Sequence, residues 1–129
     1  MKYYIIAGEA SGDLHGSNLI RGIKKNDPNA EIRAWGGSEM QKAGAEIRKH
    51  YKKLAIMGFV EVLLHLKTIK ENFKFAKKDI LEFNPDLVIT IDFPGFNLRM
   101  SKWTFKNNFR HFHYISPNVW AWKKKRVYK

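Results

Sequence analysis

The stretch KYYIIAGEASGDLHG, residues 2–16, decides the fold of this chain. Its first six residues, Lys2–Ala7, form a short apolar run that ends in glycine, which is typical of a buried strand. Over residues 13–25 apolar side chains recur at helical spacing, and Asp13 is a candidate N-cap for that helix. A strand that leads through a tight turn into a helix indicates an α/β domain.

Strand and helix patterns continue to alternate along the chain. β-rich runs predict further strands at residues 31–35, 46–48, 87–91 and 111–115. Helical periodicity and turn signals predict further helices at residues 38–43, 66–83 and 98–108. Strands separated by helices favour a parallel sheet with helices on both faces. We therefore predict a single Rossmann-like α/β domain over residues 1–129.

The composition excludes several classes of protein. The chain has 129 residues, 44% of them hydrophobic, which suits one globular domain and not a disordered chain. It has no cysteine, so disulfides, thiolate metal sites and cysteine nucleophiles are excluded. No stretch reaches the ~20 apolar residues that span a bilayer, and no secretory pattern opens the chain. We expect a cytoplasmic location.

The charge is strongly basic and unevenly distributed. Lysine and arginine number 24 against 12 Asp and Glu, which gives a formal net charge of +12. No acidic residue follows Asp92, whereas basic residues continue as far as Lys129. Such a surface attracts nucleic acid, anionic lipid headgroups or phosphorylated substrates, and charge alone does not choose among them.

Three loops that follow predicted strands have side chains suited to chemistry, and ligands of parallel sheets bind beyond those strand ends. The first loop contains Glu9, Ser11, Gly12 and Asp13. Its carboxylates would repel a phosphate, so sugar hydroxyls are the better ligand. The structural alternative is that Asp13 and Ser11 cap the helix and the glycines only permit the turn.

The second loop begins with Asp92, directly after the strand at residues 87–91. A carboxylate at a strand end beside aromatic rings suits a general base with a raised pKa, which could deprotonate a sugar hydroxyl. The alternative is an Asx-turn in which Asp92 bonds the backbone ahead of Pro94.

The third loop, residues 114–122, contains two tryptophans, Trp120 and Trp122. Their rings could stack on a sugar or meet acyl chains, and the alternative is that one of them packs in the core. His113 lies inside a predicted strand and is read as structural. His15 and His50 do not form a spaced cluster with carboxylates, so we predict no metal site.

Residues 54–66 (LAIMGFVEVLLHL) are apolar except for Glu61 and His65. This segment is either an interfacial membrane segment or wall for acyl chains, or a buried helix packed on the sheet. The lysines of the following helix form a solvated face in the simplest reading, and beside an apolar segment they could instead bind anionic lipid.

Taken in order, these stretches resemble the lipid-A-disaccharide synthase family. The resemblance is carried by AGEASGDLHG (residues 7–16), LAIMGFVEVL (54–63), PDLVITID (85–92), PGFN (94–97) and HYISPNVWAWKKKRV (113–127). It implies the N-terminal, acceptor-side domain of a GT-B glycosyltransferase, here truncated, with the C-terminal UDP-sugar domain absent. The implied reaction transfers 2,3-diacylglucosamine from its UDP derivative to 2,3-diacylglucosamine 1-phosphate, giving lipid A disaccharide 1-phosphate and UDP without metal or cofactor.

The resemblance also implies roles for individual residues. Asp92 corresponds to the essential aspartate, a general base on the acceptor 6-hydroxyl. Two loops correspond to those that line the substrate cleft. Their substrate-binding residues are Glu9, Ser11, Gly12 and Asp13 in the first loop and Ser116, Asn118, Trp120 and Trp122 in the second. The apolar segment corresponds to a membrane-facing or acyl-contacting region that includes Met57, Phe59, Val60, Val62 and Leu63. Some members have an aspartate where this chain has Gly95, so that position receives no catalytic role.

The resemblance implies a peripheral protein on the inner face of the cytoplasmic membrane, with both acylated sugars as partners and no nucleic acid. We expect the 129 residues to be inactive alone, because the donor domain is not included. The alternative function is a non-enzymatic basic module that binds nucleic acid or anionic membrane, supported by the charge of +12 and an aromatic share of 14%.

Overall fold

The computed structural model describes residues 1–52, 62–91 and 96–114, without the side chains of residues 62–69 and 97. Five strands alternate with helices: β1 (Lys2–Ala7), β2 (Glu31–Gly36), β3 (Glu46–His50), β4 (Leu87–Ile91) and β5 (His111–Tyr114). The described helices are α1 (Ala10–Asn26), α2 (Ser38–Lys42), α4 (Val62–Phe83) and α5 (Phe96–Lys106).

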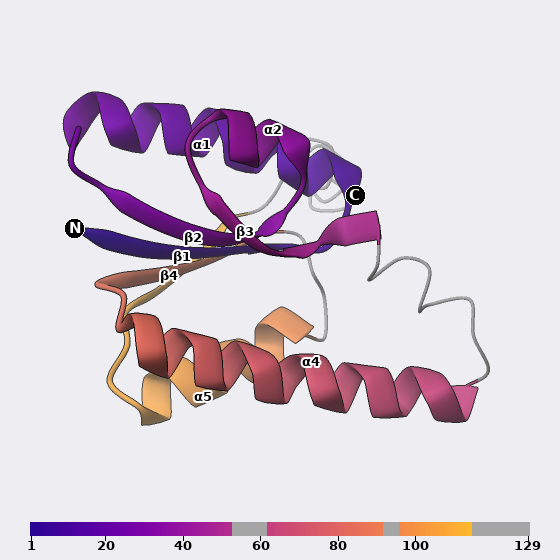
Figure 1. Ribbon diagram of the computed structural model, residues 1–129. Coiled ribbons are helices and arrows are strands. Elements are labelled where there is room, and N and C mark those ends of the chain that lie inside the picture. The colour runs from indigo at the N-terminus through magenta and orange to yellow at the C-terminus, as the bar shows by residue number, and fades with distance from the viewer. Residues whose placement is uncertain (53–61, 92–95, 115–129) are drawn as a thin grey trace, which may run out of the picture.

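All described strand pairs are parallel and form one sheet in the order β3-β2-β1-β4-β5. Helices α1 and α2 cover one face, and α4 and α5 cover the other (Figure 1). The predicted α/β Rossmann-like fold with helices on both faces is therefore confirmed. No helix in the described ranges is long and apolar enough to cross a membrane.

The strand predictions at Lys2–Ala7 and Leu87–Ile91 match the structure, but several helix ends differ. The first helix begins at Ala10, so the prediction of Asp13 as its N-cap was wrong: Glu9 is the N-cap, and Asp13 lies within the first turn. The helix predicted at residues 66–83 already begins at Val62, inside the apolar segment.

The core has two parts, one on each face of the sheet. On the α1–α2 face, aliphatic side chains such as Ile5, Ile20 and Ile91 pack with Met40. On the α4–α5 face, Trp35 is fully buried and its ring centroid lies 5.3 Å from that of Phe96. Aliphatic residues therefore pack one helical layer and aromatic residues much of the other.

A buried carboxylate ties α4 to the sheet. Asp79 is 2% exposed and accepts hydrogen bonds from Tyr4 Oη at 2.8 Å, Arg33 Nη1 at 2.8 Å and Arg48 Nε at 3.2 Å. Trp35 Nε1 in turn donates to Tyr4 Oη at 2.8 Å. Burial and the bond to Asp79 raise the pKa of Tyr4, so its hydroxyl stays a donor. The buried charge is thus paired, as burial requires.

Candidate functional site

The carboxyl ends of the five parallel strands lie at one edge of the sheet, on the right in Figure 1. Strand order reverses between β1 and β4, since the chain winds one way from β1 through β2 to β3 and the other way from β4 to β5. A doubly wound sheet has its ligand crevice at this point, because the adjoining loops part to opposite faces. The loop from Gly8 to Glu9 follows β1, and Asp92 is the residue after β4.

The first predicted loop lies at this reversal point. Glu9 and Ser11 are exposed, whereas Gly12 is buried. A Cβ on Gly12 would lie 2.9 Å from Cβ of Ala7 and 3.6 Å from Cγ2 of Ile91. Only a residue without a side chain lets α1 approach the ends of β1 and β4 so closely. Gly12 therefore places two exposed polar residues beside the strand that leads to Asp92.

Asp13 is 3% exposed, and backbone groups occupy its carboxylate. Its Oδ1 accepts hydrogen bonds from the N–H of Gly37 at 2.7 Å and of Met40 at 3.0 Å, and its Oδ2 accepts one from Glu39 at 3.1 Å. These N–H groups belong to the start of α2, which has no intrahelical acceptor for them. Asp13 thus caps α2 and not its own helix, and it ties the loop after β1 to the loop after β2.

This geometry separates the residues of the first loop by role. The backbone carbonyl of Glu9 accepts a hydrogen bond from the N–H of Asp13 at 3.0 Å, but its carboxylate has no hydrogen-bond or ion-pair partner within the described part of the chain and is available to a ligand. The carboxylate of Asp13 already accepts three bonds and acts on the position of the loops. Direct substrate contact by Glu9, Ser11, Gly12 and Asp13 stays a prediction.

Two residues at the same edge were not selected from the sequence. His15 of α1 and Tyr114 of β5 have ring centroids 6.1 Å apart, and both rings are half-buried. Tyr114 pairs with Ile91 in the sheet, so it lies next to the strand end that precedes Asp92. His15 follows Ser11 by four residues in α1, a spacing that puts both on one helix face. That spacing was a signal for His15, whereas Tyr114 needed the strand register.

A second polar cluster lies on the α5 side of β4 and β5. Thr90 Oγ1 is hydrogen-bonded to His111 Nε2 at 2.8 Å and to His113 Nδ1 at 3.0 Å, and Thr104 Oγ1 to His111 Nδ1 at 3.2 Å. Burial, with a smaller contribution from His113, lowers the pKa of His111. The reading of His113 as a structural residue agrees with its bond to Thr90.

Most of the other predicted site residues lie outside the described ranges. These are Asp92, Ser116, Asn118, Trp120, Trp122, Met57, Phe59 and Val60. Val62 and Leu63 are described only as backbone in the first turn of α4. Their proposed roles stay predictions.

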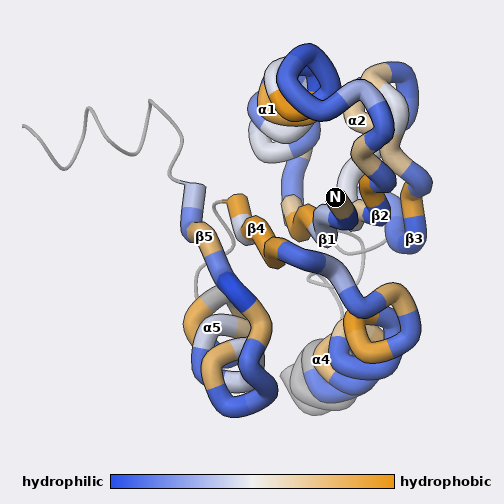
Figure 2. Tube along the Cα trace, turned by 90° about the vertical axis from the view of Figure 1, so that its left-hand side faces the viewer, coloured by the Kyte–Doolittle hydropathy of each residue, from blue (hydrophilic) through white to orange (hydrophobic). Residues whose placement is uncertain are grey.

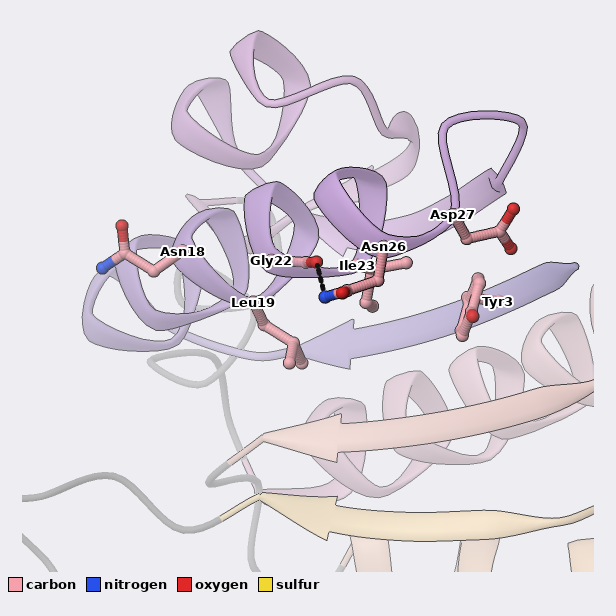
Figure 3. Close-up of a pocket in the computed structure, with 7 residues that line it drawn as sticks. All are labelled: Tyr3, Asn18, Leu19, Gly22, Ile23, Asn26 and Asp27. Carbon is pink, nitrogen blue, oxygen red and sulfur yellow. Dashed lines mark hydrogen bonds between the residues drawn. The ribbon is translucent and has the colours of Figure 1, made fainter.

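A hollow of about 440 Å³ lies away from this edge, against the flank of α1 (Figure 3). Its lining runs from Asn18 and Leu19 to Asn26 and Asp27, with Tyr3 of β1 opposite. It includes neither Glu9 nor Ser11, so it is not part of the loop edge. Within the described residues no three His, Cys, Asp or Glu side chains gather closely enough to hold a metal ion.

The parallel sheet, its reversal point and the close β1–α1 turn define a doubly wound α/β domain with a candidate ligand crevice between β1 and β4. Residues 3–129 match the family described as lipid-A-disaccharide synthetase. The chain belongs to that family.

Curated relatives carry the corresponding name. The lipid-A-disaccharide synthase of Trichlorobacter lovleyi is 45% identical over 125 residues, which are 97% of this chain and 33% of the relative. The synthase of Coxiella burnetii is 39% identical with the same coverage, and that of Xanthomonas campestris pv. campestris is 41% identical over 97% of this chain and 28% of the relative. The chain thus spans about a third of the length of the curated relatives it matches.

Proposed function

We propose that this chain is the acceptor-side part of a GT-B glycosyltransferase of lipid A biosynthesis. The single observation that carries the proposal is the family match over residues 3–129, which includes the strand-end loops of the candidate crevice. The substrates are UDP-2,3-diacylglucosamine as donor and 2,3-diacylglucosamine 1-phosphate as acceptor. The products are lipid A disaccharide 1-phosphate and UDP.

Asp92 is the general base of the proposed reaction. It takes the proton from the acceptor 6-hydroxyl as that oxygen forms a bond to the anomeric carbon of the donor sugar. The bond from this carbon to the UDP oxygen breaks, and UDP leaves with the electron pair. Such a base typically contributes 10²–10⁴-fold to a rate.

The described loop supports acceptor binding in the same place. Glu9 and Ser11 are exposed beside the end of β4, and carboxylate and hydroxyl oxygens suit sugar hydroxyls. Asp13 and Gly12 fix the position of that loop through three backbone bonds and a close helix–strand contact. The exposed residues Glu9 and Ser11 therefore contact the acceptor, and the buried residues Gly12 and Asp13 position the loop.

The enzyme acts as a peripheral protein on the inner face of the cytoplasmic membrane, where substrates with acyl chains partition. The reaction as written needs no metal or cofactor, and we expect no nucleic-acid partner. The 129 residues alone should show no turnover, because the relatives are about three times as long and the donor site is assigned to the remainder.

The role of Asp92 is tested by replacing it in the full-length protein. Asp92→Asn and Asp92→Ala should lower the turnover number by a factor on the order of 10² or more, measured as UDP release. The matched control is Asp86→Asn, an exposed residue just before the opposite end of β4, which should leave turnover within about twofold. Near-normal turnover in both Asp92 variants would remove this residue from the mechanism.

A further inference from the structure

The outward face of α5 exposes two large apolar side chains on one stripe. Leu98 is 63% exposed and Phe105 is 84% exposed. They are seven residues apart, about two helical turns, so they lie one above the other. The opposite side of the helix packs in the core through Phe96, Met100 and Thr104. Single exposed apolar residues are ordinary, but a stripe on which an aromatic ring lies almost wholly in solvent suggests a binding surface.

Basic residues flank this stripe. Arg99, Lys102 and Lys106 are exposed along one side of it, and α5 contains no acidic residue. Among these residues the structure shows no ion pair within the described ranges. Their charges are therefore available to an external anionic partner.

Helix α4 extends the surface, since α4 and α5 lie side by side on the same face of the sheet (Figure 2). The rings of Phe73 and Phe96 join the two helices, with centroids 5.8 Å apart. A row of exposed residues faces outward on α4 at intervals of three and four: Lys70, Lys74, Lys78 and Leu81. Leu81 is 56% exposed. The acidic residues Glu71 and Glu82 of α4 are exposed beside this row, which leaves α5 as the more basic part.

We propose that the outward face of α4 and α5 docks on an anionic lipid bilayer, with Leu98 and Phe105 entering the headgroup region. Apolar side chains that enter the interface, together with cations that attract anionic headgroups, are the two contributions that bind an interfacial helix. The residues of this surface differ from those of the strand-end loops and from those of the apolar segment at residues 54–66. The inference extends the proposed function, because a surface-bound enzyme would meet its acylated substrates where they partition.

Lipid fits this surface better than nucleic acid does. Proteins that bind single strands place aromatic rings where bases can stack on them, within a basic groove. Here two of the three large apolar side chains, Leu81 and Leu98, are aliphatic, and they project from the outer faces of two helices. Aliphatic side chains cannot stack as rings do, but they are soluble in the acyl boundary of a bilayer.

The apolar contribution is tested by co-sedimentation of the full chain with vesicles of phosphatidylglycerol and phosphatidylcholine. The double variant Leu98→Ser/Phe105→Ser should weaken partitioning about tenfold or more. The matched control is Leu14→Ser/Phe112→Ser. These two residues do not belong to the α4–α5 surface, and their side chains are 52% and 54% exposed. The control should change partitioning less than about twofold. All four substituted residues are exposed, so both variants should fold, and the midpoint of denaturant unfolding checks this for each variant.

The ionic contribution is tested in the same assay. Lys102→Gln/Lys106→Gln should weaken binding to these vesicles about tenfold, whereas Arg21→Gln/Lys25→Gln on α1 removes equal charge and should have less than half that effect on the logarithm of the partition coefficient. Binding of the unaltered chain should fall with added salt and be absent on phosphatidylcholine alone.

Equal losses in the α5 variants and their controls would overturn the inference, and so would tight binding of duplex DNA by a chain that ignores the vesicles. Turnover of detergent-dispersed substrates separates this result from the proposed function. Made in the full-length protein, the α5 variants should keep that activity. A failed vesicle assay therefore leaves the transfer reaction standing, and an inactive full-length protein leaves the docking surface standing.

Discussion

The two helical layers are attached to the same sheet by different chemistry. On the α1–α2 side, short contacts dominate: Gly12 lets α1 lie against Ala7, and the Asp13 carboxylate accepts three backbone N–H groups. On the α4–α5 side, aromatic rings and a buried ionic network dominate, including Trp35 and the Asp79 carboxylate. The first mode fixes backbone positions, and the second attaches helices through long side chains.

This difference agrees with the roles proposed for the layers. The loop after β1 leads into the α1–α2 layer, where an error of an ångström in the position of Glu9 would matter to substrate binding. The α4–α5 layer has an outer surface of lysines, arginines and exposed apolar residues, which a fluid lipid partner would accept without close fit. Substitutions can test whether the α1–α2 layer is as sensitive to small changes as these contacts indicate.

Among these substitutions, Asp13→Ala should cause the largest loss in the free energy of unfolding. The variant removes an acceptor from three N–H groups, two of them in buried bonds, so we expect a loss of about 2–4 kcal/mol in the free energy of unfolding. Denaturant unfolding measures it. The control is Asp86→Ala, whose carboxylate accepts one exposed bond from Lys2 N at 2.8 Å and should cost less than about 1 kcal/mol. Similar losses in both variants would show that capping of α2 does not stabilise this layer.

The role of Asp13 illustrates what the sequence could not predict. Helix-forming residues around Asp13 suggested a local cap, because local patterns describe the chain only within a few residues. In the structure its carboxylate instead accepts hydrogen bonds from the start of α2, which requires α2 to lie against α1. The donor residue Gly37 is 24 residues further along the chain. A contact of that range is set by the tertiary packing of two helices and leaves no local signal.

The strands and the order of elements could be predicted, because alternating apolar runs and helical periods are local. Leu87–Ile91 was assigned from its β-rich run alone, and the structure has the same bounds. Asp79 shows the intermediate case. It is four residues from both Phe75 and Phe83, a spacing that puts the three residues on one side of α4, but its partners Arg33 and Arg48 come from strands whose pairing the sequence does not state.

Two glycines of α1 offer a sharper test of close packing. Gly12→Ala should lose about 1–3 kcal/mol in the free energy of unfolding, since the new methyl group would lie 2.9 Å from Cβ of Ala7 on a rigid strand. Gly22→Ala lies in the same helix with no atom within 4 Å of the added Cβ, and it should gain up to about 1 kcal/mol from helix propensity. Chemical denaturation compares the two directly. Stabilisation by Gly12→Ala would mean that α1 can move away from β1. The α1–α2 layer would then not be sensitive to small changes in packing.

The smallest change in the free energy of unfolding should come from a substitution in the α4–α5 layer, His111→Gln. Burial, and then the charge of His113, lower the pKa of His111 in the folded chain, so the unfolded chain takes up this proton at a higher pH than the folded chain does. The stability contributed by the neutral ring is therefore complete above the unfolded pKa and decreases as the pH falls from there through the lowered folded pKa. His111→Gln should flatten this part of the curve when unfolding free energies are measured between pH 7.5 and pH 5, values set by the ordinary range of histidine. The unaltered chain, measured under the same conditions, gives the reference slope. An unchanged slope in the His111 variant would assign the pH dependence to other groups, and the Thr90 cluster would then contribute to packing without responding to pH.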